Sequence, residues 1–197
     1  MRSARDLIAE VVKTGPAPML KRHGFKKTAF NFARRQGSVA HFLNLQLSQW
    51  NQGTDGQFYI NVGVMFDDMH RLRSSEPPLL PKYEDCEFVV RWEQLDSQLP
   101  SSVKVDETTD LKELSDWLTQ RIENAFVVPL NSVSSTQDFG RTGWVTAVPW
   151  GFPAKFHFVV GDVAEARRLV QLEANTFADR GCTFESVAEG LHLSFDN

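Results

Sequence analysis

Two adjacent stretches, HFLNLQLSQW (residues 41–50) and GQFYINVGVMF (residues 56–66), decide the fold. Apolar and polar side chains alternate in both, which is the pattern of a β-strand with one buried face. The short polar segment between them predicts a turn, so the two stretches form an antiparallel hairpin. The positions that share the expected core face are Leu43, Leu45, Leu47, Phe58, Ile60, Val62, Val64 and Phe66.

Side-chain amides occupy the other face of the same hairpin. Asn44, Gln46 and Asn61 alternate with the apolar positions, so they point away from the core. Amides donate and accept hydrogen bonds, aromatic rings stack, and cations attract carboxylates or phosphates, so such a face suits a partner molecule. Amides that are solvated or tied to covering helices are the structural alternative, and the sequence leaves both interpretations open. The candidate recognition face comprises Lys27, Asn31, Arg35, Asn44, Gln46, Trp50, Tyr59 and Asn61.

Periodicity in the rest of the chain predicts an α+β fold. Period-2 alternation indicates strands, and spacing of 3.6 residues with capping residues indicates helices. The result is an antiparallel sheet of at least four strands in a meander, packed by helices and followed by a C-terminal β-α-β tail. Expected strands are 25–35, 38–50, 57–66 and 86–94, expected helices are 3–13, 110–127 and 162–180, and the tail strands lie near 154–161 and 190–195.

One domain is expected for residues 1–197, because a chain of this length builds a single core. Residues 67–85 lack a period and hold three prolines, so they are expected to form a loop or flap over the sheet edge. Residues 130–197 are expected to form a C-terminal extension packed on the same sheet.

Composition narrows the class of protein. A hydrophobic content of 42% with 23% charged residues is typical of soluble globular proteins. The apolar runs are too short for a membrane span, and the opening residues lack the apolar core of a secretory signal, so a cytoplasmic location is predicted. Cys86 and Cys182 stand far apart and are expected to be reduced thiols. The histidines lack the short spacings of metal ligands, so neither a metal nor a cofactor is predicted.

Charge is distributed unevenly along the chain. Residues 1–40 hold nine Lys or Arg and two acidic residues, a formal net charge of +7, whereas residues 41–197 carry −11. This asymmetry indicates either an anionic partner for the basic segment or mutual neutralisation of the two segments in the fold.

Several short motifs occur in a fixed order along the first two thirds of the chain. They are a Gly-Phe after a basic helix (Gly24, Phe25), an Asn-x-Gln on the second strand (Asn44, Gln46), an Ile-Asn-hydrophobic-Gly on the third (Ile60, Asn61, Val62, Gly63) and an Arg followed shortly by Leu on the fourth (Arg91, Leu95). Taken together, these motifs resemble a bacterial family known as domain of unknown function 4304. The resemblance covers about residues 5–127, and it implies a fold and no activity.

Three classes of function remain. The favoured one is an interaction module that binds another protein in an immunity-like or regulatory role. The first alternative is an enzyme whose site is assembled only by folding. Ser135, Asp138 and Arg141 are its candidate residues, but their segment lacks the spacing of a phosphate loop or nucleophile elbow. Asp67, Asp68 and His70 are expected to be a solvated loop end rather than metal ligands. Nucleic-acid binding through the basic segment is the second alternative, and the whole-chain net charge of −4 argues against it.

Overall fold

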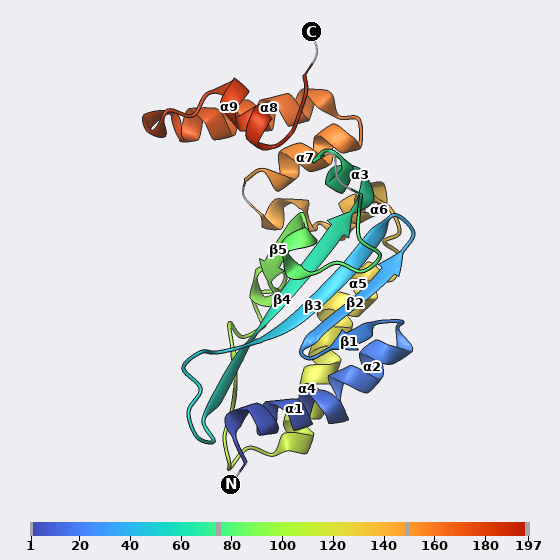
Figure 1. Ribbon diagram of the computed structural model, residues 1–197, viewed down its shortest axis with the longest axis vertical. Helices are drawn as coiled ribbons and strands as arrows, with labels where there is room; N and C mark the ends of the chain where they lie inside the picture. Colours follow the sequence, from blue (N-terminus) through green and yellow to red (C-terminus); the bar gives the residue numbers. More distant parts are fainter. Residues whose placement is uncertain (1, 74–75, 149, 196–197) are drawn as a thin grey trace.

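An antiparallel sheet runs through the middle of the molecule, with helices against one face and beyond one end (Figure 1). The computed structural model describes residues 2–73, 76–148 and 150–195. Strand order is β1-β2-β3-β4-β5, and β6 pairs with the first residues of β4. In the described residues the six strands are β1 (Lys26–Thr28), β2 (Asn31–Gln36), β3 (Val39–Leu47), β4 (Gly56–Phe66), β5 (Phe88–Arg91) and β6 (Val103–Val105). The predicted α+β class with an antiparallel sheet is confirmed.

Helices surround the sheet unevenly. The described helices are α1 (Ala4–Thr14), α2 (Pro16–Arg22), α3 (Asp67–Arg71), α4 (Leu111–Ile122), α5 (Val128–Leu130), α6 (Thr136–Phe139), α7 (Phe152–Val159), α8 (Val163–Thr176) and α9 (Phe184–Gly190). A π-helical turn, Glu123–Val127, joins α4 to α5. Figure 1 shows α1, α2 and α4 beside the sheet and α7 to α9 beyond its end. Within the part of the chain that the structure describes, no helix has the length and apolarity to cross a membrane.

The central hairpin forms as expected. β3 and β4 pair from Val39 opposite Phe66 to Leu47 opposite Phe58, which places Leu45 opposite Ile60. The predicted core positions are fully buried except Leu47, which packs against the rim of the same cluster. Period-2 patterning therefore identified both the hairpin and its buried face.

Helices α1 and α4 cross at close range over this buried face. Ser3 caps α1 in a reciprocal arrangement with Asp6, and one stripe of the helix enters the core. At the crossing the Ser115 hydroxyl donates to the Val11 carbonyl over 3.0 Å. A Cβ on Gly15 would lie 2.6 Å from the Ser115 carbonyl oxygen, so only glycine allows this approach.

The predicted strand 25–35 is wrong as a single element. Its residues form β1 and β2, joined by a two-residue turn in which Ala29 has φ 53°. A residue with positive φ is usually glycine or asparagine, and alanine rarely adopts this conformation. The sequence therefore gives no signal for this turn. The hairpin places Lys27 opposite Phe32, on the helix-covered side of the sheet, instead of on the amide face where it was expected.

The predicted C-terminal β-α-β tail is also wrong. Residues 152–159 form α7, and residues 191–195 follow α9 without strand structure. Phe152 and Phe156 lie one helical turn apart and are both buried, while Pro153 occupies the first turn of the helix, where proline is tolerated. A short apolar run does not distinguish strand from buried helix, which explains the error.

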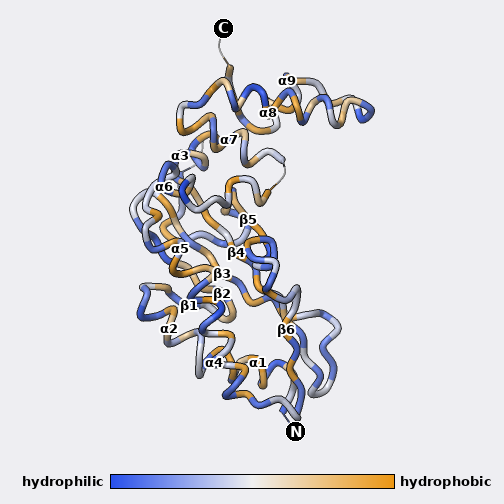
Figure 2. Tube along the Cα trace, turned by 180° about the vertical axis from the view of Figure 1, so that it is seen from behind, coloured by the Kyte–Doolittle hydropathy of each residue, from blue (hydrophilic) through white to orange (hydrophobic). Residues whose placement is uncertain are grey.

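The C-terminal helices build a second cluster. α8 was predicted correctly as a helix, and Figure 2 shows apolar and polar segments alternating along it. Its buried Val170 and Ala174 pack with α7 and α9, rather than on the sheet. Phe139 and Phe152, in contrast, contact Phe66 and Phe88 and so extend the main core. The single-domain organisation, with residues 130–197 as an extension, stays a prediction.

Replacing Leu45 or Ile60 with Ala should lower the free energy of unfolding by about 2–5 kcal/mol, because each change removes buried apolar surface and leaves a cavity. Urea denaturation measures the change. Leu79→Ala is the control, since Leu79 is 72% exposed and its truncation should have little effect. Equal effects at Leu45 and Leu79 would contradict the assignment of the core face.

Candidate functional site

Three asparagines form a continuous ladder across the sheet face that points away from α1 and α4. Asn31, Asn44 and Asn61 occupy directly opposed positions on β2, β3 and β4. Asn61 Nδ2 donates to Asn44 Oδ1 over 2.9 Å, and Asn44 Nδ2 donates to Asn31 Oδ1 over 2.6 Å. We call this set of three side chains the amide ladder. Each amide orients the next, so the row is held in one arrangement.

Gln46, Tyr59 and Arg91 border the amide ladder on the same face. Gln46 Oε1 also accepts from Asn61 Nδ2 over 3.1 Å, and Gln46 lies opposite Tyr59. Arg91 lies opposite Asn61, and its guanidinium stacks 4.2 Å from the centre of the Tyr59 ring. The polar face therefore ends in a cation held against an aromatic ring.

Exposure rises along this polar face. Asn61 is 4% exposed, Asn44 and Asn31 are half-buried, and Gln46 is exposed. Among the described residues, no protein group accepts from Asn31 Nδ2 or Gln46 Nε2. The Nδ2 group of the buried Asn61 is thus satisfied within this face, whereas Asn31 and Gln46 present free donors.

A flap, residues 76–87, covers the other half of the same face. Phe42 and Met65 lie beneath it and pack with Cys86 of the flap, whose Sγ would be 2.9 Å from a Cβ on Gly63. Arg35 anchors the flap, because its guanidinium donates to the carbonyls of Pro78 and Leu79 and pairs with Asp67. Residues 67–71 form α3, so only the later part of the expected 67–85 loop is a flap.

A groove of about 470 Å³ lies between the flap and the β1–β2 hairpin. Its wall includes Asn31, Phe42 and Tyr83, so one end of the amide ladder opens into it. The uncovered part of the sheet face and this groove are continuous.

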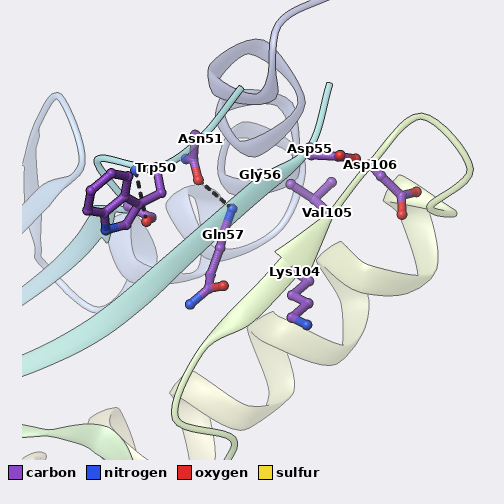
Figure 3. Close-up of a pocket in the computed structure, with 9 residues that line it drawn as sticks. Trp50, Asn51, Asp55, Gly56, Gln57, Lys104, Val105 and Asp106 are labelled. Carbon is purple, nitrogen blue, oxygen red and sulfur yellow. Dashed lines mark hydrogen bonds between the residues drawn. The ribbon is translucent and has the colours of Figure 1, made fainter. Parts of the chain in front are cut away.

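A separate hollow of about 290 Å³ lies at the β3–β4 turn (Figure 3). Asn51 Oδ1 accepts from the Gln57 backbone over 2.8 Å, which fixes the turn. Figure 3 shows the Trp50 ring at the opposite end of the hollow from Asp55 and Asp106. These side chains therefore do not converge on one point, and Trp50, 77% exposed, stands apart from the amide ladder.

The structure brings together most of the sequence-predicted recognition residues. Asn31, Asn44, Gln46, Tyr59 and Asn61 are neighbours on one face. The cation beside the amides is not one of those expected. Arg35 is hydrogen-bonded to the flap and Lys27 lies on the other side of the sheet, so Arg91 is the cation on this part of the face. Arg91 was missed as a site residue, although the alternation of FVVR already places it on the outward face of its strand.

The other chemical candidates have structural partners. Asp68 accepts from the Thr136 hydroxyl, and Ser135 caps α6. The Ser135 and Ser134 hydroxyls, which donate to the Asp138 carboxylate, hold its pKa below the usual value. Within the described ranges, no group of three His, Cys, Asp or Glu side chains is arranged to hold a metal ion.

A buried carboxylate lies where the flap, β4 and α3 meet. Burial raises the pKa of Glu87, whose oxygens accept from the Phe66 backbone and approach His70 Nδ1 at 3.3 Å. Lys155 of α7 is 8% exposed, and burial lowers its pKa while the charge of Glu87 opposes that shift. Glu87 therefore acts on α7 through its charge.

A buried Arg–His pair lies inside the helix-covered face. Arg34 Nε donates to His41 Nδ1 over 3.0 Å, and its Nη1 donates to both the His23 carbonyl and Asn131 Oδ1. The acceptor role of Nδ1 makes His41 neutral, and burial together with the Arg34 charge lowers its pKa to about 3. Arg34 thus joins α2 and the end of α5 to the sheet.

An antiparallel sheet covered by helices on one side, with an amide-lined second face, defines an α+β protein with an open sheet surface. The chain belongs to the family described as domain of unknown function (DUF4304), which matches residues 16–150. That range includes the amide ladder and the flap and ends before α7, whereas the sequence resemblance suggested about residues 5–127. No curated protein and no solved structure matches the chain.

Stability should distinguish the inner amide from the outer one. Asn61→Ala should lower the free energy of unfolding by about 1–3 kcal/mol, because it removes a buried donor that serves two acceptors. Gln46→Ala should change it by less than about 0.5 kcal/mol, since that side chain is exposed. Urea denaturation of both variants provides the measurement, and an equal loss would show that the ladder is not graded in burial.

Acid should destabilise the protein through His41. In the unfolded chain His41 takes up a proton near the ordinary histidine pKa of 6.5. Folded His41 has a pKa of about 3, so it stays neutral until the pH approaches that lower value. Between these values the unfolded state binds more protons, so His41 lowers the free energy of unfolding as the pH falls, by about 1.4 kcal/mol per pH unit at most. His41→Gln retains an acceptor for Arg34 without titrating, and its stability should fall less steeply between neutral pH and about pH 4. Identical slopes in urea titrations would contradict the buried neutral imidazole.

Proposed function

We propose that this protein is a binding module that holds a segment of another protein against its open sheet face. The observation that carries the proposal is the amide ladder, which begins at a groove and ends beside an exposed Gln46. Main-chain N–H and C=O groups of a bound segment match amides, which both donate and accept. Capture of a partner in an immunity-like or regulatory role is the activity that suits such a module.

Preorganisation supports the proposal. The hydrogen bonds from Asn61 to Asn44 and from Asn44 to Asn31 fix the side chains before any partner arrives, so binding costs less ordering entropy. Beside them, Arg91 and Tyr59 already form a stacked pair. Arg and Tyr are enriched at the centres of protein interfaces because they combine large contact area with few directional bonds.

The same geometry favours a protein over a nucleic acid as the partner. Sheet surfaces that bind single strands use exposed aromatic rings on which bases stack. On the uncovered part of this face the Tyr59 ring is already stacked by Arg91. A formal net charge of −4 also opposes a polyanion.

An enzyme would need an activated nucleophile or a free general base in an accessible site. The sequence candidates Ser135 and Asp138 are occupied in capping α6. The open face, in contrast, has the features of a contact surface, so binding is the function the geometry supports best.

Quantitative affinity capture tests the proposal. The immobilised full chain is compared with a Gln46→Ala/Arg91→Ala variant, using mass spectrometry of proteins retained from lysate. A specific partner should be retained about tenfold less by this variant, since truncating interface centres typically costs about 1 kcal/mol or more each. Stability should change little, because neither side chain is buried.

Gln120→Ala/Arg121→Ala is the matched control, with the same residue types exposed on α4. It should retain the partner as the unaltered chain does. Loss of the partner from both variants, or from neither, would contradict binding at the sheet face.

A further inference from the structure

A lysine-rimmed groove lies between α2 and β1, apart from the amide ladder. Its volume is about 710 Å³, larger than the hollow at the β3–β4 turn and the groove beside the flap. The lining combines apolar residues and a glycine, which we call the floor, with cationic residues, which we call the rim. The floor residues are Ala17, Pro18, Gly24 and Phe25, and the rim residues are Lys13, Lys21, Lys26 and Lys27. We call this feature the lysine groove.

Local structure explains why lysines from three elements converge. α2 turns Met19 and Leu20 into the core, which leaves Ala17 and Lys21, four residues apart, on the outer side. Gly24, with φ 83°, ends this stretch and starts the return into β1. The β1–β2 turn at Ala29 then sets Lys27 on the helix side of the sheet.

The rim carries charge that the fold does not neutralise. Among the described residues, none of the four groove lysines has an ion-pair partner, and the groove lining contains no acidic residue. Two other cations of the basic segment form ion pairs: Arg35 pairs with Asp67, and Arg2 pairs with Glu10. In the described part of the chain, four of the nine Lys and Arg side chains of this segment line the groove without an ion pair.

We infer that the lysine groove binds an acidic segment of another protein that inserts an apolar side chain between the lysines. Carboxylates match the rim, and an apolar side chain gains by covering Ala17 and Pro18. This inference goes beyond the proposed function, because the groove lies on the helix side of β1 and the amide ladder lies on the other.

The floor argues against a nucleic-acid strand. Phe25, the one aromatic residue lining the groove, is 4% exposed. Its ring packs against Phe126 and carries the Arg34 guanidinium at 4.7 Å, so it has no free face for a base. Single-strand binding sites depend on such stacking platforms. Carboxylates with an apolar anchor fit this lining better than phosphates with bases.

Fluorescence anisotropy with defined probes tests the inference on the full chain. The probe is a short fluorescein-labelled peptide of alternating Glu and Leu. Its comparators are the same peptide with Gln for Glu, the same peptide with Ser for Leu, and oligothymidylate of similar length. The Glu–Leu peptide should bind in a saturable way, and each of the three comparators should bind about tenfold more weakly.

The variant Lys13→Gln/Lys21→Gln/Lys27→Gln should bind the Glu–Leu peptide about tenfold more weakly than the unaltered chain, because three attractive charges are lost. Lys26 is left unchanged because it also lines the groove beside the flap. Lys104→Gln/Lys112→Gln/Arg141→Gln is the matched control, with the same change in net charge at exposed positions elsewhere. All substituted side chains are exposed, so circular dichroism should show unchanged thermal unfolding in both variants.

Four outcomes would overturn the inference: oligothymidylate binding at least as tightly as the peptide, equal weakening in the control, no saturable binding, or self-association of the chain that the groove variant abolishes. The first would assign the groove to nucleic acid and the last to a second copy. The test is independent of the sheet face, because Gln46→Ala/Arg91→Ala should bind the peptide like the unaltered chain.

Discussion

Alternation of side chains along β3 and β4 is the constraint on which the rest of the structure depends. Leu43 and Leu45 can be buried only if Asn44 and Gln46 face the other way, because successive strand residues point to opposite faces. A slip of one residue in the register would bury the amides and expose the leucines, so a single pairing is strongly preferred. The helix-covered core and the polar face are therefore two results of one local pattern, and neither can be altered without the other.

The sheet separates two surfaces of different chemistry. On one side the amide ladder offers neutral hydrogen-bonding groups, and on the other the lysine groove offers cations around an apolar floor. β1 is the boundary: Lys27 faces the helix side, and Lys26 lines both the lysine groove and the groove beside the flap. Lysines on a short edge strand also discourage pairing with the edge of another sheet. That protective role accounts for charge on β1 itself, but not for Lys13 and Lys21, which reach the groove from α1 and α2.

Local periodicity made the central hairpin predictable from its alternation, and α1, α4 and α8 from their buried stripes and recognisable caps. The β1–β2 hairpin could not be predicted, since its turn depends on Ala29 at a positive φ that only the paired strands impose. The assignment of α7 failed because Phe156 and Phe158 alternate like a strand, while the buried pair of Phe152 and Phe156 has helical spacing. In the candidate site, the alternation located the amides, but the ladder order and the stacking of Arg91 on Tyr59 depend on register between strands that no single strand encodes.

The amide ladder is explained better by specificity than by stability. A hydrogen bond contributes only about 0.5–1.5 kcal/mol net, because the unfolded chain bonds the same groups to water. Apolar side chains at Asn44 and Asn61 could contribute as much through burial. They would, however, add apolar surface to the uncovered part of the face, which invites association with any exposed hydrophobic surface. Amides bonded to one another leave polar groups that a partner must match in position, and a partner that fails to match them loses its own hydrogen bonds to water. In the proposed binding role, the ladder would therefore discriminate between partners at little cost in folding free energy.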